Sequence, residues 1–149
     1  MSNTEMTYCE YDFESFRRYI SDEVLREGRP GEIKKFFFEG DAGFQKKMEQ
    51  AKNYIKKLNE GECVEMIYDD TISGNGHDGM VLTNQRIIDT YMNKYVDYYV
   101  RLEDVLDIIP MEKTHVIVKG KNKELKIPCT GSYEVRLIFA RELKDLLHL

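Results

Sequence analysis

The sequence lacks tryptophan and has only three prolines and three cysteines among 149 residues. The cysteines, Cys9, Cys63 and Cys129, form no CxxC pair, which argues against a disulfide framework or a zinc ribbon and favours a reducing compartment. No apolar run approaches the ~18 residues that a membrane span needs. The first residues, Met1 to Met6, are polar and acidic, unlike a secretory signal. We therefore expect a soluble, cytoplasmic protein of about one domain.

A concentrated basic face is also missing. Residues 1–61 carry 11 Lys and Arg against 12 Asp and Glu, and residues 62–149 carry 11 against 15. This balance argues against nucleic-acid binding, which depends on cations that neutralise phosphates. One local cluster surrounds a predicted turn: Lys119, Lys121, Lys123 and Lys126. We favour a solvated hairpin tip for this cluster, and the alternative is a site for an anionic lipid headgroup or another anion.

Catalytic motifs are absent as well. The three histidines are far apart in the chain, and no G-x-S-x-G, phosphate-binding glycine loop or Cys-His spacing accompanies them. Four potential metal ligands do gather in the loop from Asp69 to Asp78: Asp69, Asp70, His77 and Asp78. Their spacing fits neither an EF-hand nor a zinc-binding helix, so a hydrated glycine-rich turn is favoured over a metal-dependent enzyme. We predict no catalytic residue, metal site or cofactor.

The first third of the chain has helical periodicity. Apolar residues recur every three or four positions from Asp12 to Glu27, and Gly28 and Pro30 follow as stop signals. A second helix is predicted from about Gly43 to Leu58. The segment from Ile33 to Phe38 fits either a helical turn or a buried strand.

After Gly61 the periodicity changes to the alternation of strands. The apolar runs predict about seven strands, a count uncertain by one because the sixth strand combines two runs: 62–68, 70–73, 79–83, 86–91, 95–101, 105–109 with 115–119, and 124–129. Thr130 or Ser132 can cap a final amphipathic helix that runs nearly to the C-terminus.

One stretch has a more specific pattern. The residues from Gly79 to Ile87 read Gly-Met-Val-Leu-Thr-Asn-Gln-Arg-Ile, which predicts a tight hairpin at Asn84. With Glu62 opening the first strand, a Leu-x-Asp-Val-x-x-Ile segment from Leu102 to Ile108 and a terminal helix, residues from about 61 to 149 resemble bacterial pleckstrin-homology-like (PH-like or GRAM-like) domains.

The resemblance implies an α+β fold: a half-open barrel of seven antiparallel strands in two near-orthogonal sheets, capped by the C-terminal helix. Residues 1–60 would form a helical appendage, packed on this barrel or on a second copy. Such domains are usually binding modules for lipid headgroups, peptides or other subunits. The usual phosphoinositide loop corresponds to Asp69–Asp78, where acids would repel phosphate, so we expect that site to be absent.

Tyrosines give the remaining signal. Several lie in or beside two neighbouring predicted strands, and tyrosine suits contact surfaces as well as cross-strand packing. We favour packing, but outward-facing side chains would form a candidate protein-binding patch of Tyr95, Asp97, Tyr99 and Arg101. The sequence thus favours a non-catalytic module for protein–protein interaction or self-assembly.

Overall fold

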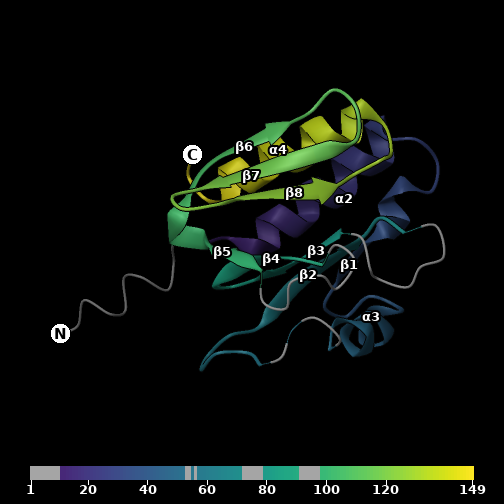
Figure 1. Cartoon of the computed structure of the whole chain (residues 1–149). Helices are drawn as coiled ribbons and strands as arrows, with labels where there is room; N and C mark the ends of the chain where they lie inside the picture. Colours follow the sequence, from purple (N-terminus) through teal and green to yellow (C-terminus); the bar gives the residue numbers. More distant parts are fainter. Residues whose placement is uncertain (1–10, 53–54, 56, 72–78, 91–97) are drawn as a thin grey trace.

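The computed structural model describes residues 11–52, 55, 57–71, 79–90 and 98–149. Within these residues the chain has an α+β fold with three α-helices and two antiparallel sheets (Figure 1). The sheets are separate, one of five strands and one of three. No helix in the described ranges is long and apolar enough to cross a membrane.

The five-stranded sheet is a meander in the order β1-β2-β3-β4-β5. Its strands are β1 (Phe36–Phe38), β2 (Val64–Asp69), β3 (Gly79–Thr83), β4 (Arg86–Asp89) and β5 (Tyr99–Arg101). The predicted hairpin is confirmed: β3 and β4 pair in antiparallel register, with Leu82 opposite Ile87. Asn84 follows β3 directly and accepts a hydrogen bond from the backbone N–H of Cys63 (2.9 Å), which ties the turn to the start of the sheet.

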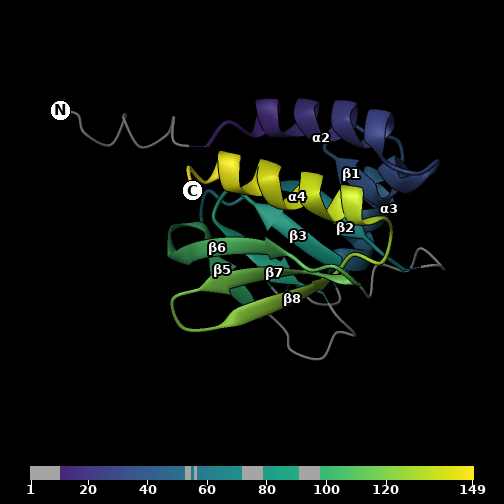
Figure 2. The same ribbon diagram turned by 90° about the horizontal axis from the view of Figure 1, so that it is seen from above.

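The second sheet has the order β6-β7-β8 and follows a short 3₁₀ turn, η3 (Leu102–Asp104). Its strands are β6 (Val105–Pro110), β7 (His115–Gly120) and β8 (Glu124–Pro128). The predicted C-terminal helix is confirmed as α4 (Tyr133–Leu146), capped by the Ser132 side chain. In Figure 2, α4 lies between β6 and the first described helix, α2 (Phe13–Glu27).

The predicted first helix is also confirmed. Asp12 caps α2 by accepting the Ser15 N–H, and the helix ends at Glu27 before Gly28. The ambiguous segment after it contains both predicted alternatives: a 3₁₀ turn, η1 (Glu32–Lys35), is followed by β1. Residues before position 60 therefore supply a helix to the same buried cluster as α4 and an edge strand to the five-stranded sheet.

Several predicted boundaries were wrong, and the first strand after Gly61 is Val64–Asp69 instead of 62–68, so Glu62 precedes it. The second helix, α3, covers Phe44–Ala51 instead of 43–58; of the remaining predicted range, residues 53, 54 and 56 lie outside the described residues and the others are not helical. The predicted strand 70–73 is not formed at Asp70 and Thr71, where the Thr71 N–H bonds to the Asp69 side chain, and residues 72–73 lie outside the described residues. Strand β4 ends at Asp89 instead of residue 91. Of the predicted strand 95–101, residues 95–97 lie outside the described residues, Tyr98 is not in a strand, and Tyr99–Arg101 form β5.

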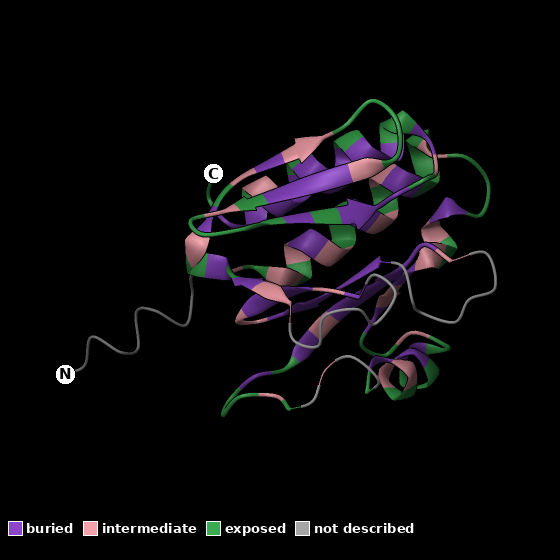
Figure 3. Ribbon diagram, in the orientation of Figure 1, coloured by how far each residue is buried: buried purple, intermediate pink, exposed green. Residues whose placement is uncertain are grey.

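Both faces of the five-stranded sheet are covered, so β3 is buried along its whole length (Figure 3). One face packs in the main core with α2, α4 and the second sheet. The other face forms a smaller cluster under α3, which lies on the opposite side of the sheet in Figure 1. Two-sided burial explains why β3 reads as a continuous apolar run rather than as an alternation.

Candidate functional site

Two members of the predicted tyrosine patch, Tyr99 and Arg101, are among the described residues and line the same cleft. Tyr95 and Asp97 lie outside the described residues. Tyr99 is half-buried, and its ring lies under the Arg86 guanidinium, 4.7 Å from the ring centroid. Arg101 is exposed and forms a 2.9 Å ion pair with Glu103. Tyr99 therefore has the packing role that the sequence favoured.

The predicted lysine cluster is divided between two places. All four of its members, Lys119, Lys121, Lys123 and Lys126, are exposed. Lys121 and Lys123 line a small cleft of about 200 Å³ together with Arg101 and Asp104. Lys119 instead lies in register between two acids, Asp107 on β6 and Glu124 on β8. These acids offset its charge, and Lys126 lies opposite Ile117 in the β7–β8 ladder, so among the described residues only Lys121 and Lys123 of the four lysines line one cleft.

The described part of the acidic loop is buried and already paired. Asp69 binds the ammonium of Lys47, and Asp70 binds that of Lys35 at 3.0 Å. Burial alone would raise the pKa of Asp69, but its bonds to Lys47 and Thr71 outweigh burial and lower it. Within the described residues no three His, Cys, Asp or Glu side chains lie together as metal ligands, and His77 and Asp78 fall outside those residues.

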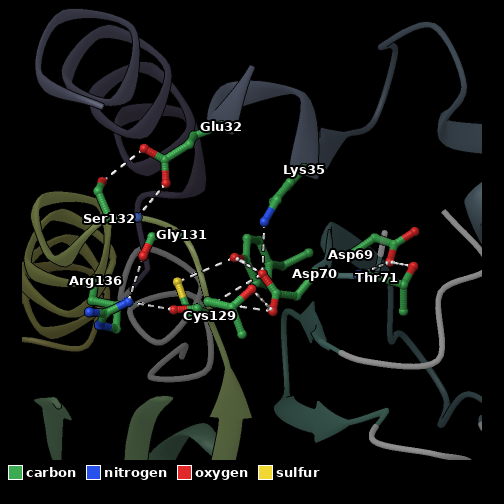
Figure 4. Close-up of polar contacts among 11 residues, drawn as sticks. Glu32, Lys35, Asp69, Asp70, Thr71, Cys129, Gly131, Ser132 and Arg136 are labelled. Atoms are coloured by element: carbon green, nitrogen blue, oxygen red, sulfur yellow. Dashed lines mark hydrogen bonds and ion pairs between the residues drawn. The ribbon is translucent and has the colours of Figure 1, made fainter. Parts of the chain in front are cut away.

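Asp70 is the centre of a polar network that joins distant parts of the chain (Figure 4). Besides Lys35, its carboxylate accepts bonds from the Tyr68 hydroxyl (2.9 Å) and from the backbone N–H and hydroxyl of Thr130 (3.1 and 2.9 Å to Oδ2). The Tyr68 hydroxyl also lies 3.2 Å from Cys129 Sγ. Burial raises the pKa of the Cys129 thiol to about 12, so this thiol stays protonated and unreactive at neutral pH.

A second pair of contacts fixes the start of α4. Glu32 accepts bonds from the backbone N–H and the hydroxyl of Ser132, at 2.7 and 2.8 Å. Arg136 donates to the backbone carbonyls of four residues around it: Met111, Glu112, Cys129 and Gly131. Because these donors and acceptors satisfy one another, the groups hold α4 in place rather than await a ligand.

A buried ion pair supports the β3–β4 hairpin. The Glu62 carboxylate receives bonds from Arg86 Nε (2.7 Å), Arg86 Nη2 (3.0 Å), the Thr83 hydroxyl (2.6 Å) and the Asn59 N–H (2.8 Å). The two charged side chains are 0% and 4% exposed. A cleft of about 720 Å³ opens beside them, lined in part by Asn84, Gln85 and Arg86. The charge of Arg86 is thus engaged inside the fold.

Exposed apolar side chains gather along α4 and β6. We use the name α4–β6 surface for Leu106, Met111, Tyr133 and Leu137, whose exposed fractions are 55%, 43%, 38% and 39%. Met111 and Tyr133 both contact Arg136, which donates to the Met111 carbonyl and lies 5.7 Å from the Tyr133 ring centroid. Leu137 is one helical turn beyond Tyr133 on the same face of α4.

The two ends of this surface are set by contacts between α4 and β6. Arg136, near the start of α4, binds carbonyls just after β6, and Lys144, near its end, pairs with Asp107 at 3.4 Å. The helix therefore runs antiparallel to the strand, as Figure 2 also shows. The exposed Leu106 lies beside Asp107, at an irregularity of the β6–β7 register. The sequence offered little to mark this surface, because each of its residues also fits an amphipathic element.

The free edge of β6 offers few backbone donors. Met111 N–H bonds to His115 O, so by the alternation of antiparallel ladders the backbone groups of Ile108 and Pro110 point away from β7. The N–H of Ile108 is already bonded to the Asp107 carboxylate at 2.8 Å, and proline has no N–H. A strand added at this edge could donate hydrogen bonds to the β6 carbonyls, but its own carbonyls would find few N–H donors on β6.

The described residues thus combine an interior of mutually satisfied polar groups with an exposed apolar surface along α4 and β6. The buried acids near the predicted loop and hairpin are all engaged in ion pairs and hydrogen bonds inside the protein: Asp69, Asp70 and Glu62. No protein-family model, curated protein or solved structure matches this chain.

Proposed function

We propose that this protein is a non-catalytic binding module that recognises another protein, or a second copy of itself, through the α4–β6 surface. The proposal includes a PH-like arrangement of the fold, in which β2–β8 form the half-open barrel and α4 closes it. Its support is the order of seven antiparallel strands followed by one helix from Val64 onward.

The observation that carries the proposal is the cluster of exposed apolar side chains. Tyr133 and Leu137 lie one turn apart on α4, and Arg136 links Tyr133 to the Met111 backbone; aromatic, Met and Arg side chains are enriched where proteins meet. The Lys144–Asp107 pair provides a polar rim beside them. Grouped apolar exposure of this kind is more informative than the same side chains scattered singly.

The partner is expected to bind through side chains more than through backbone pairing. The outward N–H of Ile108 is engaged by Asp107, and Pro110 supplies none, so strand addition at β6 would leave acceptors unmatched. An amphipathic helix or a compact apolar surface can instead place its side chains over Tyr133 and Leu137 without backbone hydrogen bonds.

Leu137→Asp is expected to weaken the interaction by about 30-fold, because a charge in the centre of an interface costs roughly 2 kcal/mol or more. Leu25→Asp is the matched control, since Leu25 is 66% exposed and belongs to a different helix, α2. Tagged wild-type and Leu25→Asp proteins should recover the same partner, or the same dimer in sedimentation, and Leu137→Asp should lose it. Equal recovery by all three proteins would contradict the proposed surface.

A further inference from the structure

Two glutamates face each other across the contact between α2 and α4. Glu23 comes from α2 and Glu142 from α4, and their side chains are 17% and 7% exposed. One cation lies beside both: Arg141 donates to Glu23 Oε1 and, at 3.3 Å, to Glu142 Oε2. Arg141 itself is 50% exposed, so it only partly offsets two carboxylates that the helices bury.

The second carboxylate oxygen of Glu23, Oε2, is buried and lacks a hydrogen-bond donor among the described residues. Arg141 bonds to both carboxylates, which places the two carboxyl groups next to each other. A proton on Glu142 would supply the missing donor, whereas two ionised carboxylates at this place would repel.

The other charged groups around Glu23 and Glu142 do not neutralise the two carboxylates. Arg26 on α2 adds a positive charge near Glu23, whereas Asp145 on α4 adds a negative charge near Glu142. A cavity of about 280 Å³ beside Glu142 is lined by further polar and titratable groups from both helix ends: Asp12, Ser15, Tyr19, Asp145 and His148. Two of these are acids, so the surroundings of Glu142 favour its neutral form.

We propose that Glu23 and Glu142 share one proton across the α2–α4 contact, and that losing this proton to solvent near neutral pH weakens the packing of the two helices. Burial and the neighbouring Glu23 raise the pKa of Glu142 from 4.5 to about 7. Glu23 has the opposite shift, because hydrogen bonding to Glu142 and Arg141 outweighs its burial and lowers its pKa. The pair therefore binds one proton, mainly on Glu142.

The sign of the pH dependence follows from this pair. Between 4.5 and about 7 the folded protein holds a proton that the unfolded chain has released, so the folded state is favoured most at the acidic end. As pH rises through this range, the contribution is lost. Above it, both states have released the proton and the contribution no longer changes.

Glu142→Gln tests the proposal, because an amide remains neutral and can donate to Glu23 Oε2 at every pH. At pH 8 we expect the unfolding equilibrium constant of this variant to be roughly 10- to 100-fold lower than that of the wild type, since each unit of pKa shift is worth tenfold. The advantage should fall to a few-fold by about pH 5 and disappear below the ordinary pKa of 4.5. The measurement is urea unfolding followed by circular dichroism at several pH values.

Glu134→Gln is the matched control, because Glu134 is an exposed acid in the first turn of α4. Its pH profile should run parallel to that of the wild type. A carbon-13 titration of the glutamate carboxyl groups gives a readout that needs no variant, and Glu142 should titrate near pH 7. Parallel stability profiles for Glu142→Gln and the wild type, or titration of both Glu23 and Glu142 below pH 5, would overturn the shared proton.

Discussion

Glu62→Ala is expected to lower the free energy of unfolding by about 3–5 kcal/mol, the usual cost of leaving one partner of a buried ion pair uncompensated. Glu62 is fully buried and receives bonds from Arg86, Thr83 and Asn59. Loss of the Glu62 carboxylate leaves the Arg86 guanidinium, which is 4% exposed, buried without its anionic partner. Urea unfolding monitored by circular dichroism measures the change.

Two further variants separate the charge from other causes. Glu60→Ala removes an exposed acid two positions earlier and should change stability by less than about 0.5 kcal/mol. Replacing Glu62 and Arg86 together by leucine and methionine should recover much of the loss, because no buried charge then remains unpaired. A single Glu62→Ala variant within 1 kcal/mol of the wild type, roughly the lower limit of diagnostic changes, would contradict the buried pair.

The same carboxylate gives a direction for acid unfolding. Burial would raise the pKa of Glu62, but bonds from Arg86, Thr83 and Asn59 outweigh it and lower the pKa below its ordinary value of 4.5. Because the pKa of Glu62 is lower in the folded state, ionised Glu62 stabilises the fold at pH values above 4.5. This stabilisation is lost as pH falls from 4.5 through the lowered pKa of the folded state. Glu62→Ala should therefore show a weaker acid-induced loss of stability than the wild type.

Gly79→Ala is the second large effect, and we expect it to cost on the order of 3 kcal/mol or more. Gly79 starts β3 with φ +155°, and a Cβ there would lie 1.9 Å from the Tyr68 carbonyl oxygen. The obstacle is backbone, and Tyr68 is held by bonds to Asp70 and Cys129. Neither strand can move away without disturbing the core.

Gly61→Ala is the matched control for this variant. Gly61 also has a positive φ, +73°, but nothing lies within 4 Å of the place where its Cβ would stand. It should cost only about 1 kcal/mol, the strain of the left-handed conformation alone. Thermal unfolding of both variants separates the backbone clash from φ strain, and equal losses would contradict the close approach of β2 and β3.

Local patterns were enough to predict several elements of the fold. The helix over Phe13–Glu27 has a three-four apolar spacing, an Asp12 cap and a glycine stop, and all three act within a few residues. The hairpin at Asn84 and the capped helix α4 are equally local. Such elements are predictable because their stabilising contacts lie within the element itself.

The contacts between distant segments could not be predicted in the same way. β1 pairs with β2 across about thirty residues, and Phe36–Phe38 alone fits a helical turn as well as a strand. Asp70 looked like a loop acid, yet it binds Lys35 and Thr130, which lie 35 and 60 positions away. Only the folded chain brings these groups together, so sequence spacing carries no sign of them.

The candidate site shows the same limit. Tyrosine chemistry pointed to Tyr99, but cation–π contacts with Arg86 and Lys123 hold its ring against the protein. Two members of the α4–β6 surface, Met111 and Leu137, belong to different parts of the chain, which the Arg136 bonds and the Lys144–Asp107 pair bring together. The types of residue in the sequence suggested that the protein has a contact surface. Where that surface lies depends on how α4 packs along β6.

Site-specific photocrosslinking from position 137 tests the binding role of this protein most directly. A photoreactive phenylalanine analogue replaces Leu137 on the α4–β6 surface, and in parallel it replaces Leu25 on α2. In living cells we predict one defined protein adduct from position 137, absent from position 25 and lost when Tyr133 is changed to aspartate. No adduct at position 137, or the same adducts at both positions, would contradict the account.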